Sequence, residues 1–353
     1  MPTMPADVVA ATGAATACAN VVEDLHGFLR ILSDGTILRS PGPVSCPAIP
    51  GEHQSVEWKD AVYDKAKNLH VRMYKPSPAA AAARGEQDGK LPVLIHFHGG
   101  GFCIGSCRWA NVHSFCLRLA AEAGAVVLSA GYRLAPEHRL PAAVEDAVGF
   151  LRWLREKSVD SAGDGWLAES ADFGRVFING DSAGGTIAHH LAVLTGSAAS
   201  NLAVELQPVT IQGFILLMPF FGGVNRTPSE ADCPTDVFLN LDLSDRFWRL
   251  SLPAGATRDH PMANPFGPDS PDLDAVNFRP VLVVAGGLDM LRDRAVDYVE
   301  RLAAMGKPVE VAEFTGEQHG FFVLCPVSDA TGELIGVVAR FLRTCVVAAP
   351  KTG

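Results

Sequence analysis

The chain lacks the patterns that mark several common protein classes. Its eight cysteines, among 353 residues, include no C-x-x-C pair, so neither a zinc ribbon nor a thioredoxin-type redox site gains support. A basic excess is also missing, because 39 acidic residues outweigh 29 basic ones and leave a formal net charge of −10. Nucleic acids and anionic membranes bind basic surfaces, so this balance argues against both as partners.

Long apolar runs are absent as well. The longest, Gly213–Phe221, is far too short to span a bilayer. Asp7 occupies the place where a signal peptide would carry its positive charge. Because the cysteines are scattered and no secretory signal precedes them, we expect a reduced protein of the cytoplasm, with the nucleus as a further option. The oligomeric state stays open, with a homodimer as one option.

What the chain does contain is an alternation of short β-branched runs with helical patterns, such as the amphipathic stretch Pro141–Lys157. This alternation is typical of a mostly parallel sheet flanked by helices, that is, of an α/β protein. Several of the runs are continuously apolar, as expected for strands buried on both faces. The eight predicted strands are Val56–Tyr63, His70–Lys75, Val93–His98, Ala125–Tyr132, Arg175–Gly180, Gly213–Pro219, Pro280–Ala285 and Val309–Phe314.

Some segments fall outside this alternation. Residues 1–20 read as a loose tail, and the Ala-rich stretch Ser77–Lys90 as an exposed loop. Glu23–Arg39 is predicted to form a helix and turn, because its leucines recur at helical spacing.

The stretch Gly222–Asn277 is too long for a plain connection and contains a predicted helix around Leu243–Leu250. Long insertions in compact enzymes usually serve as lids or binding elements. We therefore expect residues 21–353 to form one domain whose cap elements are about 21–50 and 222–277.

The first chemical motif is Gly180-Asp181-Ser182-Ala183-Gly184, which follows a predicted strand and opens a predicted helix. A nucleophile elbow requires this context, because its tight turn tolerates only small flanking side chains and lifts the serine oxygen clear of the sheet. The alternative is a Gly-rich turn without chemistry. The strand before it and the helix after it favour the elbow.

The second motif is His98-Gly99-Gly100-Gly101-Phe102, which follows another predicted strand. A glycine run lets backbone N–H groups approach a bound carbonyl without obstruction from side chains. In hydrolases with such a loop, these amides and the one after the nucleophile form the oxyanion hole, so we assign Gly100, Gly101 and Ala183 as donors. A phosphate-binding loop is disfavoured because the lysine of a P-loop is missing.

A serine nucleophile needs a base and an orienting carboxylate, which follow it in the order acid, then histidine, in this fold. Among the four histidines after Ser182, only His319 lies in a loop after the last predicted strand. Asp289 follows the preceding predicted strand. The predicted triad is therefore Ser182, Asp289 and His319, and it requires neither a metal nor an organic cofactor.

These motifs, together with Tyr132–His138, resemble the hormone-sensitive-lipase branch of the α/β hydrolases from about Glu23 to Leu342. The chain is more closely similar to plant carboxylesterases. Trp58-Lys59-Asp60, Asn68-Leu69-His70 and Phe247–His260 resemble the subgroup called carboxylesterase 15. This resemblance implies a carboxylesterase that hydrolyses and inactivates strigolactone-type hormones.

The same branch leaves two alternatives. Gibberellin receptors resemble this chain and bind a hormone without turnover, but they lack the triad histidine that His319 supplies. Hydroxyisoflavanone dehydratases keep a triad-like site, so a lyase stays open.

The expected substrate is a small hydrophobic ester, because binding pockets are mostly apolar. We predict that side chains of the two cap elements and of the glycine loop bind it, while packing of the same aromatics in the core is the alternative. The predicted substrate-binding residues are Phe28, Leu32, Phe102, Phe221, Phe238 and Trp248.

Overall fold

The computed structural model describes residues 19–42, 55–77, 79, 89–160 and 165–345. Residues 1–18 of the predicted tail, most of the loop Ser77–Lys90 and residues 43–50 of the first cap element lie outside these ranges. The chain divides into two compact units, Met1–Ser40 and Pro41–Gly353.

The first unit is a three-stranded antiparallel sheet of β1 (Val21–Leu25), β2 (Leu29–Leu32) and β3 (Ile37–Arg39). The prediction of a helix over Glu23–Arg39 is therefore wrong. Two tight turns explain the difference: His26 and Gly27 adopt positive φ values of 50° and 74° between β1 and β2, and Gly35 adopts a φ of 85° before β3. Asp-Gly is a strong hairpin signal, and here it outweighs the helical spacing of the leucines.

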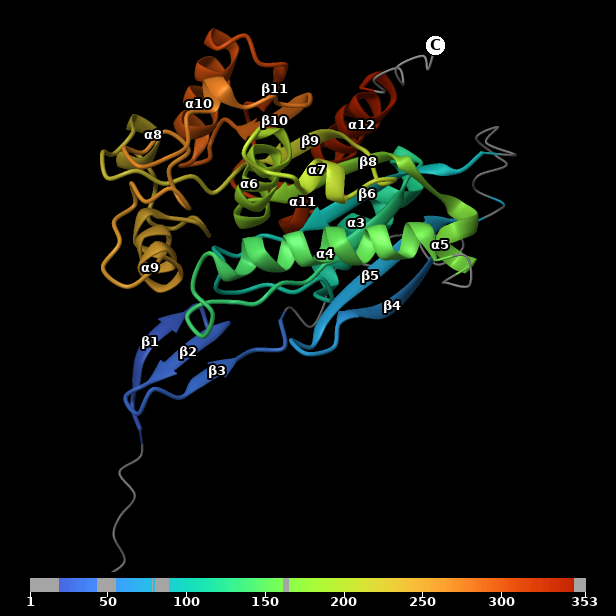
Figure 1. Ribbon diagram of the computed structural model, residues 1–353. Helices are drawn as coiled ribbons and strands as arrows, with labels where there is room; N and C mark the ends of the chain where they lie inside the picture. The colour runs from blue at the N-terminus through green and yellow to red at the C-terminus, as the bar shows by residue number, and fades with distance from the viewer. Residues whose placement is uncertain (1–18, 43–54, 78, 80–88, 161–164, 346–353) are drawn as a thin grey trace, which may run out of the picture. The chain divides into compact units, whose positions relative to one another are not determined.

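The second unit is built on an eight-stranded sheet in the order β11-β10-β9-β8-β6-β7-β5-β4 (Figure 1). The strands from β6 to β11 pair in parallel, while β5 pairs antiparallel with β7 and β4 antiparallel with β5. All eight predicted strands are confirmed. Their bounds are β4 Val56–Asp64, β5 Leu69–Pro76, β6 Leu91–Phe97, β7 Val126–Ala130, β8 Ala171–Asp181, β9 Ile211–Leu217, β10 Val281–Gly286 and β11 Val309–Phe314.

Helices cover the sheet because alternate residues of each strand point to opposite faces. On one face, Leu94, Phe177 and Ile215 join a buried cluster with side chains of α3 (Ala110–Ala123) and α12 (Asp329–Thr344). The helices α4 (Ala142–Val159) and α6 (Ala183–Gly196) pack against each other, and α6 packs on β8 and β9. The remaining helices are α5 Gly165–Ser170, α7 Leu202–Glu205, α8 Pro228–Ala231, α9 Leu241–Ser251, η1 Leu273–Ala275, α10 Arg292–Ala304 and α11 Phe321–Leu324.

Burial separates the central strands from the edge. Every residue of β7, β9 and β10 is buried, which matches their continuously apolar sequences. The edge strand β11 keeps most of its side chains at least partly exposed. The carboxyl ends of β6, β8, β10 and β11 meet at one edge of the sheet, where open α/β sheets bind their ligands.

Candidate active site

Ser182 stands at the turn from β8 into α6. It has a φ of 52° and a ψ of −114°, a backbone conformation that residues with side chains rarely adopt. Such strain persists only where the surroundings enforce it, and it is frequent at functional sites. The turn leaves no room beside it, because a Cβ on Gly184 would collide with the backbone carbonyl of Phe97 in β6. The elbow geometry predicted from the motif is therefore present.

Three side chains from different loops meet at this turn. The Nε2 atom of His319 lies 3.0 Å from the Ser182 Oγ, and its Nδ1 atom lies 2.7 Å from Asp289 Oδ2. The other carboxylate oxygen of Asp289 accepts a 2.9 Å hydrogen bond from the Leu291 backbone N–H. Ser182 and Asp289 are buried, at 7% and 3% exposure. A proton can thus pass from the hydroxyl to the imidazole while the carboxylate holds the ring in the required tautomer.

The glycine loop after β6 lies beside this chain of hydrogen bonds. Within the described part of the chain, the N–H groups of Gly100, Gly101 and Ala183 have no hydrogen-bond acceptor. Gly101 has a positive φ of 56°, and a Cβ on it would run into the ring of Phe247. Free backbone donors at the start of a helix and in a glycine loop are the groups that stabilise an oxyanion.

An aromatic cluster packs behind the glycine loop. Phe102 and Trp248 are almost fully buried, and their ring centroids lie 5.9 Å apart. Trp248 stacks on Phe220 at 4.2 Å, and Phe220 meets Phe247 edge-on. Two predicted substrate-binding residues are thus brought together, and the helix that carries Trp248 is α9, the predicted helix of the insertion. Their contact with a substrate stays a prediction.

The other predicted substrate-binding residues belong to other elements of the chain. Phe238 is 38% exposed in the insertion. Phe28 and Leu32 belong to the first unit, where Phe28 lies in the turn between β1 and β2 and Leu32 ends β2. Phe221 is buried and packs on Tyr298 with ring centroids 4.9 Å apart. The role of each in binding stays a prediction.

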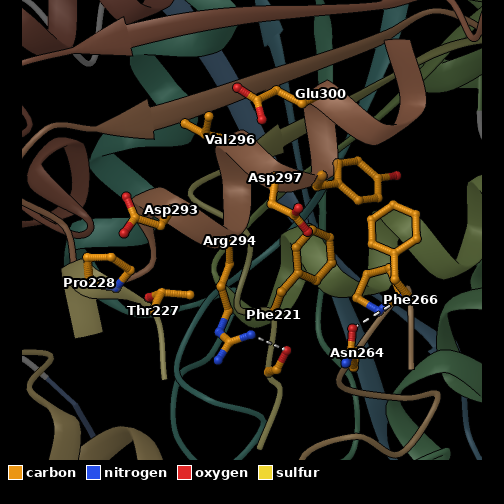
Figure 2. A pocket seen from close by; sticks show the side chains of 13 residues that line it. Phe221, Thr227, Pro228, Asn264, Phe266, Asp293, Arg294, Val296, Asp297 and Glu300 are labelled. Atoms are coloured by element: carbon orange, nitrogen blue, oxygen red, sulfur yellow. Dashed lines mark hydrogen bonds between the residues drawn. The ribbon is translucent and has the colours of Figure 1, made fainter. Parts of the chain in front are cut away.

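Phe221 also lines a cavity of about 480 Å³ between α10 and the insertion (Figure 2). Phe266, Tyr298, Arg294 and several carboxylates form its other walls. A second cavity of about 520 Å³ is lined by Asp289, the carboxylate bonded to His319, and by Leu288 and Cys233. Ser182 lines neither of these two cavities.

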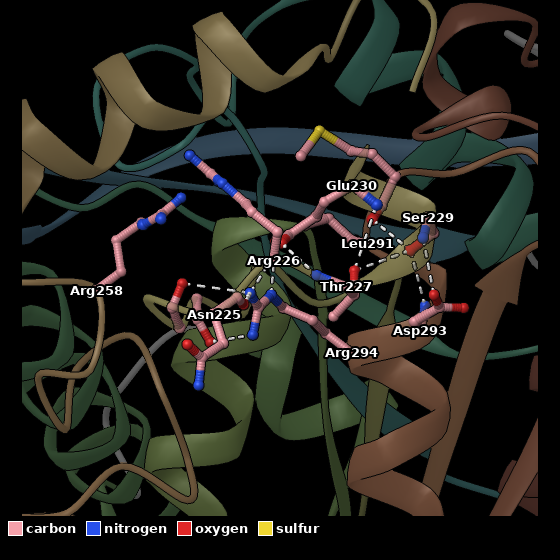
Figure 3. Close-up of polar contacts among 12 residues, drawn as sticks. Asn225, Arg226, Thr227, Ser229, Glu230, Arg258, Leu291, Asp293 and Arg294 are labelled. Atoms are coloured by element: carbon pink, nitrogen blue, oxygen red, sulfur yellow. Dashed lines mark hydrogen bonds and ion pairs between the residues drawn. The ribbon is translucent and has the colours of Figure 1, made fainter. Parts of the chain in front are cut away.

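A buried ion pair attaches the start of the insertion to α10 (Figure 3). Arg294 donates from its Nε to Glu230 at 2.6 Å and from its other nitrogens to the backbone carbonyls of Gly222 and Asn225. Glu230 is only 3% exposed and completes a capping box at the start of α8. Because α10 begins three residues after Asp289, this network connects the loop that carries Asp289 to the insertion.

Sequence reasoning missed two buried polar residues next to the elbow. Asp181 precedes Ser182 and is 6% exposed, and His96 in β6 is fully buried. Burial raises the pKa of Asp181 to about 7 and lowers the pKa of His96 to about 3. The signal for Asp181 lies inside the serine motif, whereas His96 precedes the nucleophile and so falls outside the order of serine, acid and histidine.

Two kinds of feature are absent from the described residues. No group of three or more His, Cys, Asp or Glu side chains there is arranged to hold a metal ion. In the same part of the chain, no helix is long and apolar enough to cross a membrane.

Several known proteins are similar to this chain in sequence and in fold. A family model described as "alpha/beta hydrolase fold" matches residues 94–323. "Probable carboxylesterase 6" of Arabidopsis thaliana is 41% identical over 248 residues, which is 69% of this chain and 69% of that protein. "Gibberellin receptor GID1C" of the same plant is 37% identical and covers 80% of each chain. "Tuliposide A-converting enzyme 1, chloroplastic" of Tulipa gesneriana is 33% identical over 89% of this chain and 75% of that one.

Among solved structures, an esterase of Pyrobaculum calidifontis matches with a TM-score of 0.67 and 28% identity, covering 84% of this chain and 87% of that one. The carboxylesterase EstE1 from a metagenomic library also has a TM-score of 0.67, at 27% identity, covering 83% of this chain and 90% of that one. The chain belongs to the α/β-hydrolase family. Within that family, it is a serine carboxylic ester hydrolase with plant carboxylesterases among its relatives.

Proposed function

We propose that the chain cleaves carboxylic esters through an acyl-enzyme formed on Ser182. The observation that carries this proposal is the continuous chain of hydrogen bonds from Ser182 to His319 at 3.0 Å and from His319 to Asp289 at 2.7 Å. His319 takes the serine proton as the oxygen attacks the ester carbonyl and then passes it to the leaving alcohol. Water attacks the acyl-enzyme in the second half of the reaction, again with His319 as the base.

The tetrahedral oxyanion is held by the N–H groups of Gly100, Gly101 and Ala183. Their freedom from other acceptors within the described chain supports this assignment. Removing one donor of this kind typically costs about 2.7–4 kcal/mol of transition-state stabilisation. The donors are preorganised by the backbone, so they need no rearrangement when negative charge develops.

The test is hydrolysis of p-nitrophenyl butyrate together with labelling by a fluorophosphonate probe. Ser182→Ala should abolish both turnover and labelling while the circular dichroism spectrum stays that of the wild type. Ser197→Ala, which removes a hydroxyl at the other end of α6, is the matched control and should change neither. Residual turnover in Ser182→Ala at the wild-type rate would remove the triad proposal.

For the substrate, we propose a bulky hydrophobic ester of the strigolactone type. The support is the resemblance to the carboxylesterase 15 subgroup and the aromatic character of the cluster around Trp248. Incubation with a strigolactone analogue and a panel of simple esters, followed by mass spectrometry, tests it. Cleavage of the simple esters but not of the analogue would discard the hormone and keep the esterase.

A hormone-binding receptor is the second candidate, favoured by the 37% identity to a gibberellin receptor. A receptor would return its ligand unchanged after incubation, whereas the esterase releases an acid and an alcohol. The presence of His319 beside Ser182 supports the esterase over the receptor. If the wild-type protein resists the fluorophosphonate yet removes water from a β-hydroxy ketone, a dehydratase replaces both.

We also propose that residues 21–50 and 222–277 form a cap over the site, and that the protein is located in the cytoplasm or the nucleus. Deleting residues 1–40 tests the cap. It should lower turnover of bulky esters more than that of short acyl esters, and equal losses would assign the segment to folding alone. A fluorescent fusion tests the location, for which the chloroplastic tulip relative supplies the contrary outcome.

A further inference from the structure

A second chain of polar groups lies buried beneath the elbow, apart from the triad. It runs across the neighbouring strands β6 and β8, where His96 and Asn179 are register partners. The Nδ2 atom of Asn179 lies 2.9 Å from His96 Nδ1, and His96 Nε2 lies 3.4 Å from Asp181 Oδ1. His96 and Asn179 are fully buried and Asp181 nearly so. In the described chain neither His96 Nε2 nor Asp181 Oδ1 makes a hydrogen bond, so each is the nearest polar group available to the other.

The Asn179 contact decides which nitrogen of His96 carries the proton. Burial keeps the ring neutral by lowering the pKa of His96 to about 3, so it bears a single N–H. Because the Asn179 amide nitrogen donates to Nδ1, the proton sits on Nε2. That N–H faces the Asp181 carboxylate oxygen, which needs a donor because an unsatisfied buried oxygen is costly.

The other side of Asp181 meets the glycine loop. Its Oδ2 atom lies against the Gly99 backbone, next to the proposed oxyanion donors. The contact is close, since a Cβ on Gly99 would collide with Asp181 Oδ2. Burial raises the pKa of Asp181 to about 7, while the Gly99 N–H and the charge of His319 act in the opposite direction. An N–H donor at Oδ1 therefore favours the ionised carboxylate that contacts Gly99.

We propose that His96 is a positioning residue of the esterase, which donates from Nε2 to Asp181 and thereby holds the Gly99–Gly101 amides in register with Ser182. This inference rests on the proposed function and adds residues that the triad does not contain. Oxyanion donors act on charge that develops in the transition state, so a loosened loop lowers kcat and leaves KM nearly unchanged. A displacement of about 1 Å in such a site costs on the order of 100-fold in rate.

The experiment compares two amide replacements of the same histidine. His96→Asn keeps a polar group near Nδ1, facing Asn179, but removes the donor toward Asp181. His96→Gln places an amide nitrogen near Nε2 and keeps that donor. For p-nitrophenyl butyrate, kcat of His96→Asn should fall roughly 10- to 100-fold with KM within about threefold of the wild type. His96→Gln should recover most of the loss.

Coupling to Asp181 gives an independent measurement. Asp181→Asn added to His96→Asn should cost much less than the product of the two single losses, because both changes break one chain. All rates are expressed per Ser182 that the fluorophosphonate labels, so a poorly folded fraction does not count. His189→Asn is the control, since His189 is equally buried but bonds to Tyr298 instead; it should lower the melting temperature and keep kcat per labelled serine within about twofold.

Equal kcat for His96→Asn and the wild type, or equal losses in His96→Asn and His96→Gln, would overturn the proposal. Full additivity of the His96 and Asp181 changes would do the same. Failure of the proposed function looks different, because the wild-type protein itself would then neither take the label nor hydrolyse the ester.

Discussion

Replacing Asp289 by asparagine tests how the carboxylate controls His319. The Leu291 N–H holds Oδ1 at 2.9 Å, so an asparagine there must keep its carbonyl oxygen toward Leu291. Its amide nitrogen then faces His319 Nδ1, where a donor meets a donor unless the ring moves its proton to Nε2. A ring with a proton on Nε2 cannot accept one from Ser182.

The expected loss in kcat is about 10⁴-fold, the size seen when a triad histidine is forced into the wrong tautomer. This corresponds to roughly 5 kcal/mol of barrier. The assay is hydrolysis of p-nitrophenyl butyrate at neutral pH, with circular dichroism to show that the fold is intact. Asp172→Asn is the matched control, because Asp172 lies at the other end of β8 and its carboxylate bonds to the nearby Gly174 and Arg175, so kcat should stay within about twofold. A folded Asp289→Asn protein that keeps more than about a tenth of the wild-type kcat would refute the tautomer argument.

Three further predictions concern stability. Gly184→Ala should lower the free energy of unfolding by more than about 4 kcal/mol, because the added Cβ has no room. Gly149→Ala in α4 is the control: no atom lies near an added Cβ there, so stability should be unchanged or higher. Urea unfolding measures both. Arg294→Met should lower the free energy of unfolding by about 3–5 kcal/mol, because it leaves the buried Glu230 unpaired. The double variant Arg294→Met with Glu230→Leu removes both charges and should lose less. A larger loss in the double variant would contradict this reasoning. Burial lowers the pKa of His189 well below its ordinary value, so the folded state keeps it neutral while the unfolded chain takes up a proton as the pH falls. Between about pH 7.5 and pH 5 the wild type should therefore lose roughly 2 kcal/mol more stability than His189→Asn, and equal losses would show that the histidine is not held neutral.

Local sequence patterns were sufficient to predict the strands of the second unit. Each of its eight strands contains β-branched residues, and a strand buried on both faces is continuously apolar, as β9 and β10 nearly are. The elbow around Ser182 could be predicted for a similar reason, because its small residues are needed within a few positions of one another. The helix prediction for the N-terminal segment was wrong because its apolar spacing fits a helix and a hairpin alike. Only the turns at Gly27 and Gly35 distinguish the two structures.

The sequence by itself determined the strands, the two glycine motifs and the order of serine, acid and histidine, because each strand, motif and triad position is recognised from its immediate neighbours in the chain. Only the tertiary structure decided which distant side chains touch. It placed His319 within 3.0 Å of a serine 137 positions earlier, paired Arg294 with Glu230, and set His96 against Asp181 across two strands. Such contacts follow from strand order and helix packing, which join segments whose separation along the chain carries no local pattern.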